Sequence, residues 1–135
     1  MRLKVVPQNC RHCQACALAC SMVHEQGNTS LQKARLSISW EIADKKVTII
    51  TCRHCPDPKC LEDCPPTAIT RNEKGIVIIN EETCIGCGNC ERNCPFGAIV
   101  HIEDRNKYQK CDLCMERDEG PICVEICPVN AIVLE

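Results

Sequence analysis

One run of cysteines has the spacing of a ligand motif for an iron–sulfur cluster. The run follows the pattern C-x2-C-x2-C-x3-C-P without a substitution, and consists of Cys84, Cys87, Cys90, Cys94 and Pro95. In this motif three thiolates bind one cubane [4Fe–4S] cluster and the fourth reaches a neighbouring cluster. Gly86 and Gly88 are expected to relieve crowding where the backbone passes close to the cluster. The run predicts a loop that folds around iron.

The remaining cysteines repeat this motif with variations. The chain has 16 cysteines, and they fall into four groups of four with none left over: Cys10, Cys13, Cys16 and Cys20; Cys52, Cys55, Cys60 and Cys64; Cys84, Cys87, Cys90 and Cys94; and Cys111, Cys114, Cys123 and Cys127. Because each cubane takes four thiolates, this count predicts four [4Fe–4S] clusters.

The connections between the groups predict how they share ligands. Nineteen residues separate Cys64 from Cys84, and they read as strand, turn and strand, which is the connection expected inside a two-cluster ferredoxin. If groups two and three form one pair, groups one and four form the other, so that one module is inserted into the other. Exchange of the fourth cysteine within each pair then predicts these ligand sets: Cys10, Cys13, Cys16 and Cys127; Cys111, Cys114, Cys123 and Cys20; Cys52, Cys55, Cys60 and Cys94; and Cys84, Cys87, Cys90 and Cys64.

Three other interpretations of the cysteines remain open. Groups one and two could pair, and groups three and four. Paired C-x2-C units also form zinc ribbons, although zinc sites seldom need the third cysteine or the proline after the fourth. A disulfide framework would suit a short secreted chain, but no apolar run near Met1 is long enough for a signal peptide. We therefore expect a soluble cytoplasmic protein with no membrane span.

Composition indicates that the clusters act as the core. The 135 residues include one Trp, one Tyr and one Phe, which is too few aromatics for a large side-chain core. The formal net charge is −2, and four oxidised clusters carrying −2 each would take it to about −10. Mixed charge and scarce aromatics argue against nucleic-acid binding.

The predicted elements are short, so the fold class expected is α+β. Residues 3–6 predict an edge strand that could pair with a last strand over 131–134. A helix is expected after Cys16, and it can continue past Cys20 because no proline follows that cysteine. Residues 36–42 and 47–50 alternate as a β-hairpin, in which Trp40 would fasten the hairpin over a cluster module. Strands are also expected at 66–70, 76–79 and 96–102, and the polar segment 103–107 is expected to cross to the last group.

A frame of Cys-Pro-x-x-Ala-Ile recurs after the second, third and fourth groups. Proline ends the helical turn, alanine lets the chain approach a cluster, and isoleucine begins a shielding strand. The predicted architecture is two nested bacterial-ferredoxin-like modules of short strands and helices around four clusters, plus a β-hairpin insertion. The domain ranges are 1–27 with 103–135 for the outer module, 28–47 for the hairpin and 48–102 for the inner module.

The whole chain resembles the four-cluster ferredoxin-like subunits of anaerobic oxidoreductases. The resemblance covers all four cysteine groups in order, and includes a Cys-Arg-His-Cys start to group two and a Lys-Cys-Asp-Leu-Cys start to group four. Such subunits serve dimethyl-sulfoxide-reductase-type molybdenum enzymes, formate hydrogenlyase, carbon-monoxide-oxidising complexes and tungsten aldehyde oxidoreductases. The resemblance implies nested pairing and an electron-transfer subunit between a catalytic oxidoreductase subunit and a second redox protein or subunit.

Catalysis by the chain alone is not expected. It shows no recognisable nucleophile and base and no phosphate loop, and every predicted cluster has a full set of thiolates. The alternatives to a dedicated subunit are a free polyferredoxin carrier and an accessory or maturation ferredoxin. His12 and His54 occupy equivalent places before the second cysteine of their groups, where each could donate an N–H to a cluster sulfur or lie exposed in its loop.

Overall fold

The computed structural model describes residues 2–62, 64 and 67–135 and has a mixed α+β fold of short elements. In chain order these are β1 (Leu3–Val5), η1 (Pro7–Asn9), α1 (Ala15–His24), η2 (Leu31–Lys33), β2 (Leu36–Glu41), β3 (Lys46–Thr51), α2 (Lys59–Glu62), β4 (Ile69–Arg71), β5 (Val77–Ile79), α3 (Asn89–Asn93), β6 (Val100–Ile102), β7 (Lys107–Gln109), α4 (Ile122–Ile126) and β8 (Ile132–Leu134). The described strands pair only in twos, as β1–β8, β2–β3, β4–β5 and β6–β7.

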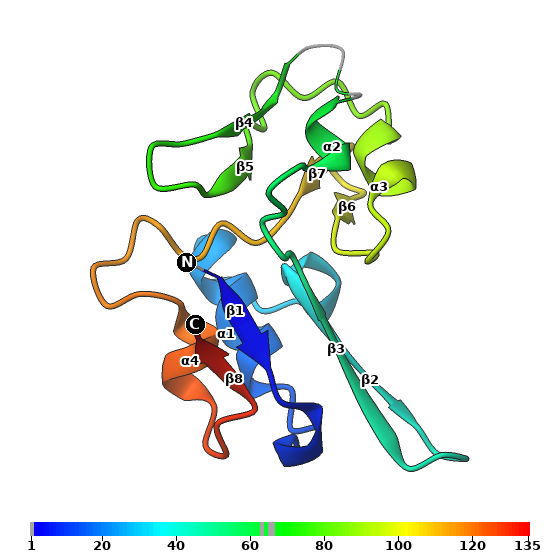
Figure 1. Cartoon of the computed structure of the whole chain (residues 1–135), viewed down its shortest axis with the longest axis vertical. Coiled ribbons are helices and arrows are strands. Elements are labelled where there is room, and N and C mark those ends of the chain that lie inside the picture. The colour runs from blue at the N-terminus through cyan, green and yellow to red at the C-terminus, as the bar shows by residue number, and fades with distance from the viewer. Residues whose placement is uncertain (1, 63, 65–66) are drawn as a thin grey trace.

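The two ends of the chain lie side by side and form one half of the molecule. β1 pairs antiparallel with β8, with Leu3 opposite Leu134 and Val5 opposite Ile132, which confirms the predicted pairing of the first and last strands. The helices α1 and α4 pack beneath this sheet (Figure 1). We call β1, β8, α1 and α4 the terminal group.

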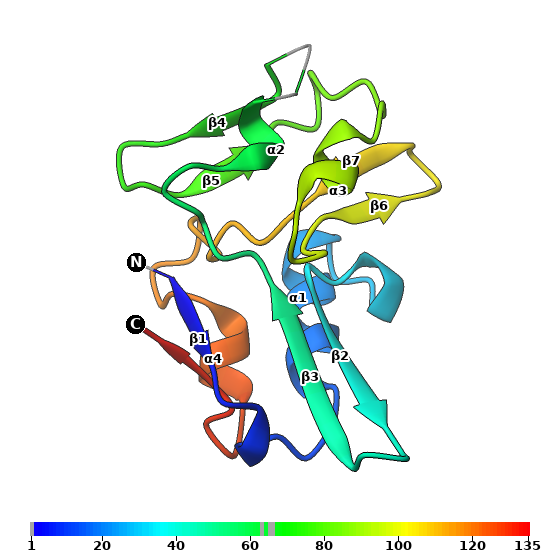
Figure 2. The same ribbon diagram turned by 45° about the vertical axis from the view of Figure 1, so that its right-hand side comes forward.

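The β2–β3 hairpin extends beside the terminal group, as both views show (Figures 1 and 2). Leu36 lies opposite Thr51, and Trp40 opposite Val47, which confirms the predicted hairpin. Because β3 extends from Lys46 to Thr51, it crosses the domain boundary expected between residues 47 and 48. Trp40 is 45% exposed and its ring centroid lies 6.3 Å from that of His12.

The middle of the chain forms the other half of the molecule, which we call the central group: α2, α3 and the hairpins β4–β5 and β6–β7 (Figure 2). The strands β4 and β5 confirm the expected pair between the second and third cysteine groups. The expectation that residues 103–107 cross directly to the last group is wrong, because the chain turns there and returns as β7 against β6. The turn is closed by backbone hydrogen bonds from Arg105 to Ile102 and from Asn106 to Glu103.

Proline placement sets helix length as expected. Ser21 follows Cys20, and α1 continues to His24, whereas α3 and α4 end just before Cys94-Pro and Cys127-Pro. Pro65, which follows Cys64, lies outside the described residues. Among the helices in the described part of the chain, none is long and apolar enough to cross a membrane.

Buried residues gather in two clusters, one mainly in the terminal group and the β2–β3 hairpin, the other in the central group. One joins Leu3, Ile132 and Leu36 to buried cysteines of groups one and four, and the other joins Ile69, Val77 and Ile99 to buried cysteines of groups two and three. The repeated Ala-Ile of the Cys-Pro frame is buried in all three copies: Ala68 and Ile69, Ala98 and Ile99, and Ala131 and Ile132. The small and apolar residues thus line the cysteines, as the frame predicts.

An arginine connects the two halves. Arg105, in the β6–β7 turn, binds Glu25 at the end of α1 through two hydrogen bonds of 2.7 and 3.1 Å, and its Nε also donates to Glu81 after β5. The Glu25 side chain is 7% exposed. Removal of the arginine would leave this carboxylate buried without its cation.

Arg105→Met is therefore expected to lower the stability of the iron-loaded protein by about 1–3 kcal/mol, the usual cost of an unsatisfied buried polar group. The midpoint of urea-induced loss of cluster absorbance under anaerobic conditions measures this effect. Lys33→Met is the matched control, because Lys33 pairs at 2.6 Å with Asp104, which is 59% exposed, on the same turn. Equal midpoints for the two variants would contradict the role assigned to Arg105.

Candidate metal centres

All 16 cysteines lie in the described part of the chain and all are free thiols. Cys13 and Cys87 are exposed, and the other cysteines are buried or half-buried. The two exposed cysteines hold the same place, the second of groups one and three. The cysteine groups therefore combine an enclosed interior with one accessible sulfur in each half of the molecule.

The four ligand loops share one backbone conformation. The residue before the second cysteine has a positive φ in every group: 60° at His12, 45° at His54, 74° at Gly86 and 59° at Leu113. Non-glycine residues adopt this conformation at a cost and keep it where the surroundings fix it. The turn aims backbone N–H groups at sulfur: His12, His54 and Leu113 donate to the first cysteine of their own groups at 3.3, 3.3 and 3.4 Å.

The glycines of group three are required by a neighbouring hairpin. A Cβ at Gly86 would lie 2.5 Å from the backbone oxygen of Asn106, and one at Gly88 would lie 2.9 Å from the hydroxyl of Tyr108. The β6–β7 hairpin therefore crowds the backbone of this loop, a cause that the sequence did not indicate. The expected crowding by a cluster stays a prediction.

Cys10, Cys13, Cys16 and Cys127 line one cavity between the two ends of the chain. Apolar residues, including Ile38, Ile49 and Ile132, complete its wall. Burial, with smaller contributions from the neighbouring thiols of Cys10 and Cys127, raises the pKa of Cys16 to about 11. Ala131 N–H donates to the Sγ of Cys127 at 3.3 Å.

Cys52, Cys55, Cys60 and Cys94 line a second cavity. Burial raises the pKa of Cys60, and the charge of Lys110 opposes this effect while Cys52 and Cys94 add to it. His54 and Lys110 also line this cavity. It differs from the first cavity in having these two basic side chains in its wall.

The other cysteines approach one another in the same way. Burial raises the pKa of Cys90 to about 12, with contributions from Cys84, Cys60 and Cys64. Burial also raises the pKa of Cys123, with contributions from Cys111, Cys114 and Cys20. The cysteines that influence Cys90 thus include Cys64 and Cys60 of group two, and those that influence Cys123 include Cys20 and Cys16 of group one.

These sites fit iron–sulfur clusters. Crowded thiols in an apolar setting resist ionisation, and only a strongly cationic centre would make all of them thiolates together. Soft thiolate sets with converging backbone N–H groups suit iron–sulfur centres. The buried Nε2 of His54 has no hydrogen-bond partner among the described residues, and His54 lines the second cavity.

A histidine network beside group four was not anticipated from the sequence. His24 Nε2 lies 3.0 Å from Asp112 Oδ1, and its Nδ1 lies 2.9 Å from the carbonyl oxygen of Cys20. Burial opposes the charge on His24, but Asp112, Cys114 and Cys20 together raise its pKa to about 12. The spacing Cys20-x3-His24 on one helix was the available signal, since residues four apart share a helix face. Because Cys114 is a predicted cluster ligand, this network belongs to the cysteine sites.

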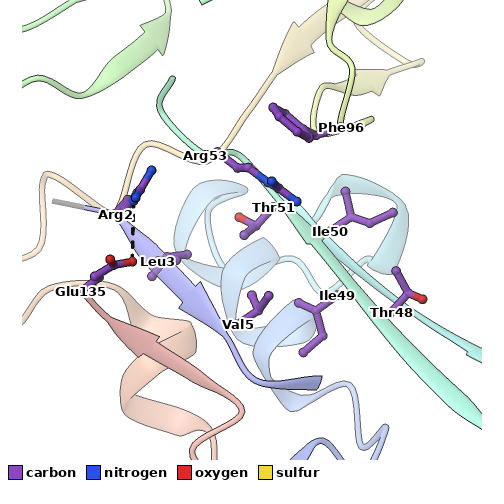
Figure 3. Close-up of a pocket in the computed structure, with 10 residues that line it drawn as sticks. All are labelled: Arg2, Leu3, Val5, Thr48, Ile49, Ile50, Thr51, Arg53, Phe96 and Glu135. Atoms are coloured by element: carbon purple, nitrogen blue, oxygen red, sulfur yellow. Dashed lines mark ion pairs between the residues drawn. The ribbon is translucent and has the colours of Figure 1, made fainter. Parts of the chain in front are cut away.

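A wider groove without cysteines lies between β1 and β3, with a volume of about 370 Å³ (Figure 3). The guanidinium carbon of Arg53 lies 4.0 Å from the centroid of the Phe96 ring, and Arg2 pairs with Glu135 at 3.6 Å. The groove shares Arg53 and Phe96 with the wall of the second cysteine cavity, but no cysteine lines it.

Together, the short-element fold and the grouped thiols define an iron–sulfur electron-transfer protein. A family model described as 4Fe-4S dicluster domain matches residues 43–135, and one described as 4Fe-4S binding domain matches residues 7–23. The chain belongs to the 4Fe-4S dicluster ferredoxin family, which confirms the resemblance inferred from its cysteine motifs.

Relatives and solved structures agree with this assignment. YsaA of Escherichia coli K12, whose name refers to electron transport, is 37% identical over 132 residues, which cover 91% of this chain and 82% of YsaA. The B subunit of anaerobic dimethyl sulfoxide reductase from the same organism is 45% identical over 86 residues, which cover 62% of this chain and 42% of that subunit. The match thus spans less than half the length of the reductase subunit.

Among solved structures, the fold resembles a subunit of the active-site complex BamBC of benzoyl coenzyme A reductase. The TM-score is 0.58 at 20% identity, covering 97% of this chain and 76% of that one.

Proposed function

We propose that this protein is the electron-transfer subunit of a larger oxidoreductase, connecting a catalytic subunit to a second redox protein. The observation that carries the proposal is the assembly of cysteines from distant groups into enclosed thiol sets. The likeness to a subunit of dimethyl sulfoxide reductase supports a catalytic partner with a molybdenum or tungsten cofactor. A hydrogenase or a carbon-monoxide-oxidising subunit is the other class of partner.

We assign the sixteen thiols to four [4Fe–4S] clusters in the sets predicted from the sequence. Group one takes Cys127 and group four takes Cys20, while group two takes Cys94 and group three takes Cys64. The cavities and the mutual effects on thiol pKa support this exchange. The two modules are then nested, and the pairing of β1 with β8 supports that order.

The proposed module boundaries follow the observed strands. The outer module comprises residues 1–27 and 110–135, the hairpin insertion residues 28–51, and the inner module residues 52–109. Relative to the ranges expected from sequence, β3 moves wholly into the insertion and β7 into the inner module.

The backbone and side chains around the cysteines favour negative charge on sulfur and keep water away from it. When bound, the clusters supply reversible one-electron oxidation and reduction. Backbone N–H groups aimed at sulfur stabilise negative charge there, and buried Ile69, Ile99 and Ile132 exclude water. The exposed Cys13 and Cys87 mark the places where a partner can approach a cluster most closely. Ile85, 61% exposed in the loop of Cys87, adds an apolar contact there.

Native anaerobic purification is expected to recover this protein with a catalytic oxidoreductase subunit in a fixed ratio that survives high salt. Mass spectrometry of the recovered complex identifies the partner, and iron analysis should give about sixteen atoms per chain, four for each cluster. A free carrier would instead be recovered as a monomer with weak contacts that salt abolishes, since diffusing carriers rely on electrostatic steering.

A further inference from the structure

A lysine is fully buried where the two halves of the molecule meet. Lys110 follows β7 directly and is 1% exposed. Its Nζ donates to the carbonyl oxygen of Val77 in the central group and, at 2.9 Å, to that of Cys111. It therefore spans from the β5 strand to the first ligand of group four.

The charge of this lysine has no carboxylate partner among the residues that the structure describes. A neighbouring cation, Arg35, donates to the backbone carbonyl oxygen of Lys110 at 3.3 Å and is paired with Asp112 at 3.5 Å. Lysine is almost never fully buried unless its charge is balanced. The sources of negative charge left at this junction are the thiolates on either side.

Lys110 adjoins two of the cysteine sets. It lines the cavity of Cys52, Cys55, Cys60 and Cys94, and it precedes Cys111 of the adjoining set. The lysine therefore lies beside predicted cluster ligands of both halves of the molecule.

The β5 residue that binds Lys110, Val77, also binds His54. Val77 N–H donates to His54 Nδ1 at 3.1 Å, so the ring proton of the neutral histidine is on Nε2. This Nε2 is buried and lacks a partner among the described residues, and the ring lines the same cavity. Both basic side chains are thus fixed by the backbone of one residue of β5, Val77.

We propose that Lys110 is a positioning residue for electron transfer: its buried ammonium group is the counter-charge shared by the two clusters at the junction of the modules, and it raises their reduction potentials above those of the outlying clusters. The inference rests on the proposed function, because it needs the four ligand sets. A fixed positive charge favours the more negative, reduced state of a nearby centre. Electrons would accordingly be held preferentially at the junction.

The expected effect is large enough to measure. A unit charge about 10 Å from a cluster, with an effective dielectric constant of about 20, changes the redox equilibrium of that cluster by roughly tenfold or more. For a one-electron couple a tenfold change corresponds to about 59 mV. Lys110→Met removes the charge with little change in length, and Lys110→Gln also removes it but keeps a hydrogen-bond donor. Lys74→Met, in the exposed β4–β5 turn, is the control for overall charge.

The test is a potentiometric titration of the anaerobically purified protein, followed by EPR spectroscopy, with iron analysis of every sample. In the neutral Lys110 variants one or two midpoint potentials should fall by at least about 59 mV, which corresponds to a tenfold change in the redox equilibrium. The other midpoint potentials, and all those of the Lys74→Met control, should shift by less than the equivalent of a threefold change. Unchanged potentials in a variant that keeps all its iron would overturn the inference, as would an equal shift in the control. Loss of clusters in both neutral variants would also overturn it, in favour of a purely structural role. Wild-type protein with far fewer than four clusters would instead refute the proposed function.

Discussion

Removal of iron is expected to unfold this protein completely at 25 °C. Each described sheet has two strands, and isolated pairs of that kind are marginal in water. Of the 25 buried apolar residues in the described part of the chain, seven are cysteines and six are alanines. The side chains that remain cannot supply the usual stability of about 5–15 kcal/mol without metal. Metal-binding free energy is folding free energy in such domains.

Far-UV circular dichroism before and after anaerobic chelation with a reductant present measures this effect. The iron-free chain should show a coil-like spectrum and no cooperative thermal transition, and addition of iron and sulfide should restore both. Holoprotein kept with the reductant but without chelator controls for the treatment. A cooperative transition in the iron-free chain would show that packing alone maintains the fold.

Cys94→Ser is expected to damage the cluster of group two, although Cys94 belongs to group three in the sequence. The thiol shares its cavity with Cys52, Cys55 and Cys60, so its loss should remove or convert that cluster and lower the iron content by up to about a quarter. Cys127→Ser should act in the same way on the cluster of group one, whose cysteines share a cavity with Cys127. EPR spectra and iron analysis of the anaerobic proteins measure both effects.

Double variants identify the affected cluster. Cys94→Ser combined with Cys55→Ser should lose little more than either alone, because both act on one centre, whereas Cys94→Ser combined with Cys87→Ser should lose two centres. Ile126→Ser, next to Cys127 and 42% exposed, controls for a serine in a ligand loop. The exchange of ligands would be wrong if Cys94→Ser and Cys87→Ser altered the same signals.

Strands with an apolar pattern were predictable from sequence, and a polar strand was not. The terminal strands and the β2–β3 hairpin follow from alternating or β-branched residues. The strand β7 was missed because Lys107-Tyr-Gln109 has no apolar pattern, and it forms only because the turn after Ile102 returns it to β6. The strand conformation of such a segment is decided by the strand that it pairs with, and not by the local preferences of its residues.

The thiol sites were predictable in composition, but their surroundings were not. Cysteine spacing predicts which residues can bind clusters, since each ligand loop is local, whereas the exchange of fourth cysteines between groups stays a prediction. His12 and His54 are equivalent in the sequence, yet only His54 is buried, because β5 and Lys110 cover it. The contact of His24 with Asp112 joins residues 88 positions apart, and no local pattern reports it.

The pairing of the first strand with the last has a consequence for synthesis on the ribosome. The hairpins β4–β5 and β6–β7 join neighbouring segments, so the middle of the chain can take up iron and sulfide while translation continues. Cys10, Cys13 and Cys16 share their cavity with Cys127, so that site stays open until Cys127 has been synthesised. During that interval these three thiols are exposed to oxidants for longer than thiols whose cavity partners are synthesised soon after them.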